Sequence, residues 1–202
     1  MATATPHKSK MPARRLLRAR GARLTKQQIR SKILLKLKTQ KEESRERKSR
    51  IIKNKLFRSA VFRRAKRVMF YISFGGEVNT AEMIKCARKL GKLVVVPLAK
   101  KGGSLRPVIF EPGAKLVRGP YGVKEPVVRT PVKTGDIDLV IVPGLAFDKK
   151  GNRLGRGKGC YDRFLKGSPS TTVSVGLAFD FQILPFIPTA KHDMRVDRLI
   201  YA

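Results

Sequence analysis

The residues of this chain that could do chemistry are most concentrated between positions 153 and 162. Three cations alternate there with three glycines, and a carboxylate follows: Arg153, Gly155, Arg156, Gly157, Lys158, Gly159 and Asp162. Glycine lets a backbone approach phosphate oxygens and turn with positive φ, while fixed cations balance negative charge. Asp162 could hold the metal ion that accompanies a polyphosphate. We therefore predict a nucleotide-binding loop; the alternative is a mobile basic turn.

This loop differs from two common phosphate-binding motifs. The chain lacks the Walker A pattern G-x-x-x-x-G-K-[ST], and the glycines of the loop do not have the G-x-G-x-x-G spacing of a dinucleotide site. The ligand must therefore be inferred from the residues around the loop.

The apolar runs of the chain predict a mainly parallel α/β sheet that would hold this loop at one end. Buried strands are expected at residues 68–72, 93–96, 139–142 and 172–177. A helix over 80–90, capped by Thr80 and closed by Gly91, separates the first two strands and gives a βαβ unit, and Pro97 should end the second strand. Residues 99–135 predict a hairpin or long loop, and a short helix is expected at 161–165. Ligands of such sheets bind at the carboxyl ends of the strands.

Two lysine-rich amphipathic helices are expected before the sheet. Thr25 is suited to cap the first helix, and the second spans residues 45–57. Their apolar faces comprise Ile29, Ile33, Leu34 and Leu37 in the first and Ile51, Ile52 and Leu56 in the second. No apolar run approaches the roughly 18 residues of a membrane-spanning helix, so we expect no transmembrane segment. We also expect no membrane among the partners of the protein.

The charge of the chain is unusual for an α/β protein. Its 202 residues include 46 Lys+Arg and 14 Asp+Glu, a formal net charge of +32, and residues 1–70 hold 24 basic and 3 acidic residues. An anionic substrate accounts for only a few of these charges, so the excess indicates contact with nucleic acid or an anionic membrane, or a targeting segment. Residues 1–24 contain five arginines and no acidic residue, which predicts a disordered extension or an organellar transit peptide. Met11 offers a second start.

The cysteines and histidines exclude two classes of protein. Cys86 and Cys160 provide no disulfide framework, and His7 and His192 give no zinc-binding spacing. A reducing compartment fits this composition. We expect a cytoplasmic protein unless residues 1–24 direct import into an organelle.

The segment around the loop resembles the 5-formyltetrahydrofolate cyclo-ligases, also called methenyltetrahydrofolate synthetases. The match runs through PGLAFD at 143–148, GNRLGRGKG at 151–159, and Tyr161 and Asp162, with further matches at 26–30, 73–80 and 192–197. The resemblance covers residues 25–202 and implies one domain over that range. Its implied fold is α/β, Rossmann-like and three-layered (NagB/RpiA/CoA-transferase-like), with a mainly parallel sheet flanked by helices and preceded by basic N-terminal helices.

The resemblance also implies a reaction, the ATP-dependent conversion of 5-formyltetrahydrofolate to 5,10-methenyltetrahydrofolate with release of ADP and phosphate. Mg²⁺ would accompany the ATP. Arg153, Arg156 and Lys158 would be the catalytic residues, because they are suited to stabilise charge on the transferring phosphoryl group. We expect a monomer whose partners are 5-formyltetrahydrofolate and ATP.

Binding residues follow from the same match. The implied ATP-binding residues are Lys26, Arg30, Arg153, Leu154, Gly155, Arg156, Gly157, Lys158, Gly159, Cys160 and Tyr161. The implied folate-binding residues are Ile72, Glu77, Arg156, Gly157, Lys158, Gly159 and Cys160. Asp162 and Asp193 match the magnesium ligands of the family.

Several of these residues have a plainer interpretation. Lys26 and Arg30, at i and i+4, share a helical face that could simply be solvated. Glu77 could be a surface-loop residue, and Asp162 could cap the helix that follows it. Asp193 could pair with Arg195 in a turn.

The chain departs from the family pattern at three positions. Cys160 stands where tyrosine is usual, and Gly76 and Lys191 stand where acidic residues are frequent. Cys160 supplies neither a ring nor a phenolic hydroxyl beside the formyl group. A second interpretation is therefore a basic RNA- or ribosome-associated protein on a cyclo-ligase fold with weakened or lost activity. Since the chain has no RNA-recognition motif and no row of stacking aromatics, the enzyme is favoured.

Overall fold

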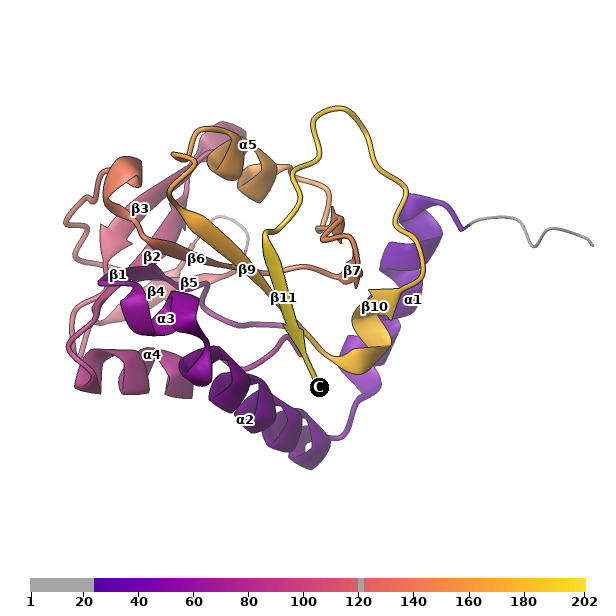
Figure 1. Cartoon of the computed structure of the whole chain (residues 1–202), viewed down its shortest axis with the longest axis horizontal. Helices are drawn as coiled ribbons and strands as arrows, with labels where there is room; N and C mark the ends of the chain where they lie inside the picture. Colours follow the sequence, from indigo (N-terminus) through magenta and orange to yellow (C-terminus); the bar gives the residue numbers. More distant parts are fainter. Residues whose placement is uncertain (1–23, 120–121) are drawn as a thin grey trace, which may run out of the picture.

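The computed structural model describes residues 24–119 and 122–202, and a six-stranded sheet forms its centre (Figure 1). The strands, in spatial order, are β11 (Arg198–Tyr201), β9 (Val173–Ala178), β6 (Leu139–Val142), β1 (Arg67–Met69), β2 (Leu93–Ala99) and β3 (Leu105–Ile109). All neighbouring strands are parallel except the antiparallel pair β2 and β3. The mainly parallel α/β sheet predicted from the apolar runs is confirmed, with β11 and β3 as additional edge strands.

Alternating side chains of the central strands build two cores. Leu139 and Ile141 of β6 belong to one hydrophobic cluster, whereas Val140 and Val142 belong to another. This division follows from the two-residue repeat of a strand, which directs successive side chains to opposite faces. Because both faces are covered, the strand is apolar throughout.

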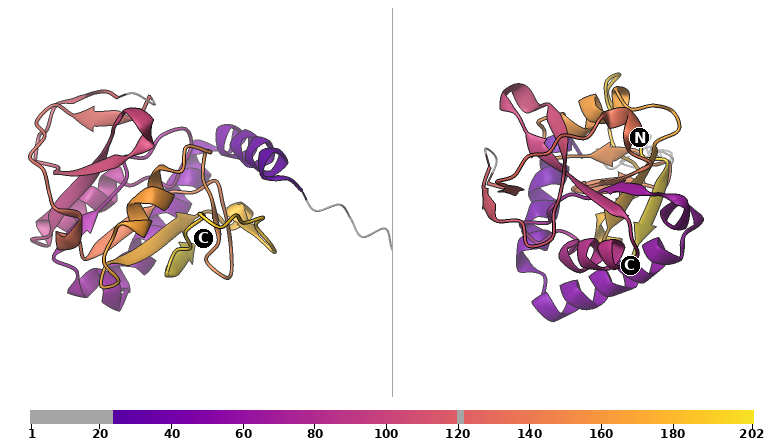
Figure 2. Two further views of the ribbon diagram at one scale, coloured as in Figure 1. Left: turned by 90° about the horizontal axis from the view of Figure 1, so that it is seen from above. Right: turned by 90° about the vertical axis from the view of Figure 1, so that its left-hand side faces the viewer.

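Five helices of the described residues cover these faces. They are α1 (Lys26–Thr39), α2 (Glu42–Arg58), α3 (Ala60–Arg64), α4 (Ala81–Lys89) and α5 (Cys160–Lys166). Buried residues of α1 to α4 join the larger core, and Phe164 of α5 joins the second. Figures 1 and 2 show α2, α3 and α4 gathered on one side of the sheet and α5 on the other. The predicted three-layer arrangement therefore holds.

The first helix begins as its sequence predicts. Thr25 Oγ1 accepts a hydrogen bond from Gln28 N, and the Gln28 side chain accepts one from Thr25 N, which completes a capping box. Its buried face is narrower than expected, because Ile29, Ile33 and Leu37 are buried whereas Leu34 is exposed. The second helix shows the same departure. Ile52 and Leu56 are buried, whereas Ile51 lies exposed at the edge of the apolar stripe.

Thr80 takes the N-cap position of α4 as expected, but its side chain makes no capping hydrogen bond. Its hydroxyl donates to Tyr71 O (2.7 Å) and accepts from Ser73 N (3.2 Å). Asn79 Oδ1 instead accepts from Ala81 N (3.0 Å) at the start of the helix. Thr80 thus ties the segment after β1 to α4, because a buried carbonyl needs a donor.

The expected end of β2 at Pro97 is wrong, since the strand continues to Ala99. Val95 O accepts from Phe70 N, and Ala99 N donates to Glu125, so these alternate residues direct their backbone groups away from β3. β1 has already ended at Met69. The missing N–H of Pro97 therefore breaks no hydrogen bond of the sheet.

Two small sheets complete the architecture. One holds β7 (Ala146–Asp148), β8 (Arg153–Leu154) and β10 (Ile183–Leu184), and the other is the hairpin of β4 (Leu116–Arg118) and β5 (Lys124–Pro126). The hairpin lies in the region 99–135, where a hairpin or long loop was predicted. The predicted extension 1–24 falls outside the described residues except for Leu24. Within the described residues, no helix has the length and apolar character needed to cross a bilayer.

Candidate active site

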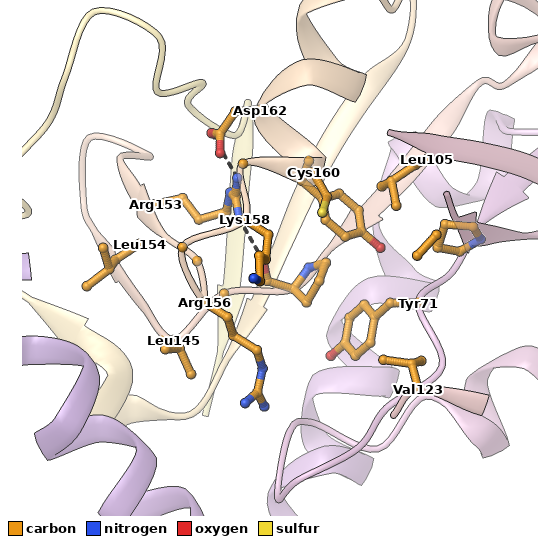
Figure 3. A pocket seen from close by; sticks show the side chains of 18 of the residues that line it. Tyr71, Leu105, Val123, Leu145, Arg153, Leu154, Arg156, Lys158, Cys160 and Asp162 are labelled. Atoms are coloured by element: carbon orange, nitrogen blue, oxygen red, sulfur yellow. Dashed lines mark hydrogen bonds and ion pairs between the residues drawn. The ribbon is translucent and has the colours of Figure 1, made fainter. Parts of the chain in front are cut away.

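Segments at the carboxyl ends of the parallel strands enclose a cavity of about 280 Å³ (Figure 3). Its walls come from residues 71–77 after β1, 143–145 after β6, the loop 155–159, the start of α1, and the two hairpins β2–β3 and β4–β5. This is the edge of the sheet where the sequence placed the site. The residues assigned on the resemblance all line it: Lys26, Arg30, Ile72, Glu77, Arg153, Leu154, Gly155, Arg156, Gly157, Lys158, Gly159, Cys160, Tyr161, Asp162 and Asp193.

The glycine loop, residues 155–159, has a positive φ at two of its three glycines. Gly157 has φ +104° and Gly159 has φ +63°, backbone conformations that residues with a side chain rarely adopt. Gly155 has no positive φ. Arg30 of α1 donates from Nε to Gly155 O (3.0 Å). This contact connects the first helix to the loop, so Arg30 is not part of a solvated helical face.

Arg163 of α5 holds the other end of the glycine loop. One guanidinium nitrogen donates to Lys158 O (2.8 Å), Gly103 O (2.7 Å) and Gly102 O (3.2 Å). The loop is thereby fastened to the turn between β2 and β3. The carbonyl of Lys158 is thus satisfied by a residue that does not line the cavity.

Arg153 and Asp162 form a buried ion pair beside this loop (Figure 3). Arg153 Nη2 lies 2.9 Å from Asp162 Oδ1, and their side chains are 4% and 17% exposed. The same aspartate oxygen accepts from Met194 N (3.0 Å). Asp162 therefore does not cap α5. It joins β8, α5 and the segment before β11.

Glu77 and Arg156, which both line the cavity, form a second pair. Arg156 Nη2 donates to Glu77 Oε1 (3.1 Å), and its guanidinium lies 4.3 Å from the centre of the Phe74 ring. Burial raises the pKa of Glu77, and the nearby Arg156 only partly offsets this effect. Glu77 is buried, so its interpretation as a surface-loop residue is wrong.

Lys26 and Asp193 form the third pair, between α1 and the segment before β11. Asp193 Oδ2 also accepts from Ala190 N (2.7 Å). Burial acts to raise the pKa of Asp193, but the hydrogen bonds from Lys26 and Ala190 outweigh it and the pKa is lowered. Its cation partner is thus Lys26, so the alternative interpretation, a pairing with Arg195, is wrong.

The two aspartates can contribute to a magnesium site only with help from a ligand. No group of three or more His, Cys, Asp or Glu in the described ranges is arranged to hold a metal ion. Asp162 and Asp193 each engage a cation through one oxygen, Oδ1 and Oδ2 respectively. Asp193 Oδ1 lies 3.9 Å from His192 Nε2. Asp162 Oδ2 and Asp193 Oδ1 are therefore the potential metal ligands. Mg²⁺ commonly takes one or two carboxylates and completes its shell with phosphate oxygens and water. The carboxylates of Asp162 and Asp193 fit this coordination preference.

Tyr161 and Cys160 line the cavity side by side at the start of α5. The hydroxyl of Tyr161 is buried and has no hydrogen-bond partner among the described residues. Burial, and then the charge of Glu77, raise its pKa well above the usual range, so the phenol stays neutral and can donate. Cys160 is a half-buried free thiol.

Several cavity residues were not found from the sequence. Tyr71, Leu105, Val123 and Glu125 line the wall opposite the glycine loop, as Figure 3 shows for the first three. Tyr71 lies just past β1 and belonged to the predicted strand 68–72. The other three lie in a region whose short apolar pieces have no clear period. The Glu-Pro pair at 125–126 was the only local signal there, and alone it does not indicate a site.

Comparison with known proteins gives a consistent result. The model of the 5-formyltetrahydrofolate cyclo-ligase family matches residues 22–202. The 5-formyltetrahydrofolate cyclo-ligase of Mus musculus is 34% identical over 188 residues, which cover 87% of this chain and 93% of the mouse protein. A probable 5-formyltetrahydrofolate cyclo-ligase of Caenorhabditis elegans is 33% identical over 177 residues, with coverage of 81% and 85%.

Solved structures agree in fold. The 5,10-methenyltetrahydrofolate synthetase of Aquifex aeolicus superimposes with a TM-score of 0.78 at 34% identity, over 88% of this chain and 90% of that one. The corresponding synthetase of Mycoplasma pneumoniae gives a TM-score of 0.73 over 88% and 98%, but at 22% identity it supports the fold alone.

Proposed function

The chain belongs to the 5-formyltetrahydrofolate cyclo-ligase family, and we propose that it converts 5-formyltetrahydrofolate and MgATP to 5,10-methenyltetrahydrofolate, ADP and phosphate. One observation carries this proposal. The glycine loop, the N-terminal basic pair, Glu77 and both aspartates line a single cavity although they come from distant parts of the chain. A cavity of this composition can bind an anionic cosubstrate beside a flat heterocycle.

The reaction needs alignment more than covalent chemistry. The formyl oxygen attacks the γ-phosphorus as the bond to ADP breaks, which gives an N5-iminium phosphate. N10 then adds to the activated carbon, its proton is lost, and the C–O bond breaks to release phosphate as the ring closes. Each step places negative charge on phosphoryl oxygens, which positioned cations stabilise.

Three cations of this chain are placed to stabilise the phosphoryl charge, and their surroundings differ. Arg153 is buried and held by Asp162, so it supplies a fixed positive charge at the base of the loop. Arg156 is 36% exposed and can turn from Glu77 towards a phosphate. Lys158 follows on the same loop. We propose that these three cations stabilise the transferring group.

Asp162 and Asp193 would hold the magnesium ion through the oxygens that their cations leave available. Bound Mg²⁺ would neutralise charge on the phosphates of ATP. Lys26 and Arg30, both at the cavity, would contact the same phosphates from α1. Lys26 would exchange its contact with Asp193 for one with ATP.

The test is a turnover assay with matched arginine variants. Purified protein is mixed with 5-formyltetrahydrofolate and MgATP, and methenyltetrahydrofolate is followed by its ultraviolet absorbance. We expect ATP-dependent formation of product by the wild type, a fall in kcat of about 100-fold for Arg156→Gln, and little change for Arg106→Gln. Arg106 is an exposed arginine of β3 that does not line the cavity. Absence of product from folded wild-type protein would refute the proposal.

A further inference from the structure

Two glutamates line the cavity, and their surroundings differ. Glu77 uses both carboxylate oxygens within the protein: Oε1 accepts from Arg156, and Oε2 accepts from Phe74 N (3.3 Å). A ligand that binds Glu77 must share or displace these donors. Arg156 balances its charge until that side chain turns towards a phosphate.

The charge of Glu125, in β5, is not balanced by a cation of the described residues. The residue is 4% exposed, and its Oε1 accepts one hydrogen bond, from Ala99 N (3.0 Å). Within the described residues it forms no ion pair, and its Oε2 accepts no hydrogen bond. Since Glu125 lines the cavity, a donor of a ligand bound there can reach its carboxylate. A buried carboxylate is unfavourable unless donors compensate it.

The hairpin is shaped around this carboxylate. A Cβ atom at Gly119 would lie 2.6 Å from Glu125 Oε1 and 2.5 Å from its carboxyl carbon, so only the absence of a side chain at 119 leaves room for it. Glu125 Oε1 in turn fastens the hairpin to β2 through Ala99. The carboxylate therefore has a fixed position over the cavity, with Pro97, Leu105 and Val123 as apolar neighbours on the same wall.

We propose that Glu125 is a specificity-determining residue whose Oε2 accepts a hydrogen bond from an N–H group of the pterin ring of the folate substrate. This inference rests on the proposed function. A reduced pterin carries an amino group and ring N–H groups along one edge and has two apolar faces. The fixed carboxylate matches the donors, and the apolar neighbours match the faces. The glycine loop, on the opposite wall, keeps its cations for phosphate.

The first test is a variant of Glu125 that replaces only its Oε2 and removes its negative charge. Glu125→Gln keeps an amide oxygen for Ala99 N and the same shape, so the hairpin should stay in place. We expect the KM for 5-formyltetrahydrofolate to rise at least about 10-fold, as for loss of a hydrogen bond to a charged group. The KM for ATP and the Tm should hardly change. Glu111→Gln, at an exposed glutamate after β3, is the matched control and should behave as wild type.

The second test asks whether Glu125 or Glu77 accepts the hydrogen bond from the 2-amino group of the pterin. The substrate is compared with its 2-desamino-2-methyl analogue, which lacks that donor, in wild type, Glu125→Gln and Glu77→Gln. We expect the preference of the wild type for the amino compound to shrink in Glu125→Gln and to persist in Glu77→Gln. The reverse pattern, an unchanged folate KM in Glu125→Gln, or a rise in the KM for ATP instead, would overturn the inference.

Binding measurements separate this inference from the proposed function. Titration calorimetry with 5-formyltetrahydrofolate in the absence of ATP reports folate affinity without turnover. If the wild type binds folate but forms no product, the comparison with Glu125→Gln still decides the role of Glu125. If the wild type binds no folate, the proposed function and the inference both fail.

Discussion

Around the cavity, individual cations and carboxylates are already matched in three pairs. Arg153–Asp162 is the most buried, whereas Lys26 and Arg156 are 29% and 36% exposed at their side chains. Breaking a buried pair costs much more than breaking an exposed one. We therefore expect Arg153 to stay with Asp162 when phosphate binds, and Lys26 and Arg156 to exchange partners. The same residue types thus have different tasks because their burial differs.

The pH dependence of stability tests the surroundings of Glu77. Because burial raises its pKa above the ordinary 4.5, the folded state binds this proton more tightly than the unfolded state does. The contribution of Glu77 to the free energy of unfolding is then most favourable below pH 4.5 and declines as the pH rises through the raised pKa. Glu77→Gln should remove this decline. Urea unfolding of both proteins between pH 4.5 and 7 measures it, and parallel curves would contradict the assignment.

Among the elements, those with strong local signals were predicted well. The strand at 139–142 is continuous and apolar, and α1 has a complete capping box, so local interactions and burial favour the same structure. The departures at Thr80 and Pro97 arose from long-range contacts, because the carbonyl of Tyr71 and the early end of β1 decide those positions. A hairpin or long loop was predicted over 99–135, but the role of Glu125 within it was missed for the same reason. Glu125 is placed by a long-range contact, in which its carboxylate accepts from Ala99 N.

The docking of α1 depends on glycine at position 76. Gly76 has φ +83°, and a Cβ atom there would lie 2.2 Å from Leu37 O, while Gln40 Nε2 donates to Gly76 O (2.6 Å). An acidic residue, frequent in the family at this position, cannot be accommodated with α1 so close. This departure from the family pattern is thus matched by the packing of α1.

Alanine substitutions at two glycines separate backbone strain from this packing. Gly91 has φ +73°, and a Cβ atom there would have no neighbouring atom within 4 Å, so Gly91→Ala should cost about 1 kcal/mol of strain alone. Gly76→Ala adds the collision with α1 and should cost about 3 kcal/mol. It should also raise the KM for ATP, because α1 supplies Lys26 and Arg30. Urea unfolding and ATP titration test both effects, and equal behaviour of the two variants would show that α1 docks differently.

For the molecule as a whole, positive charge extends far beyond the cavity. Arg47, Arg50 and Arg58 of α2 are exposed, and no ion pair to them is found among the described residues. The net charge of +32 creates a positive field that attracts anions. That field can raise the local concentration of ATP and folate, and it can equally attract RNA. Both substrates are anionic, so the charge and the proposed activity are compatible.

Ionic strength distinguishes these two consequences of the charge. If the field attracts substrate, the KM for ATP should rise several-fold between about 50 and 300 mM salt, because salt shortens the range of the field. The triple variant with Arg47, Arg50 and Arg58 replaced by Gln should show a weaker salt dependence and an unchanged kcat, since α2 lies outside the cavity. The assay is the turnover measurement at each salt concentration. If the salt dependence of the KM is the same in both proteins while affinity for a single-stranded RNA falls in the variant, the charge of α2 acts on nucleic acid and not on the substrates, because only a polyanion that spans the helix would register its loss.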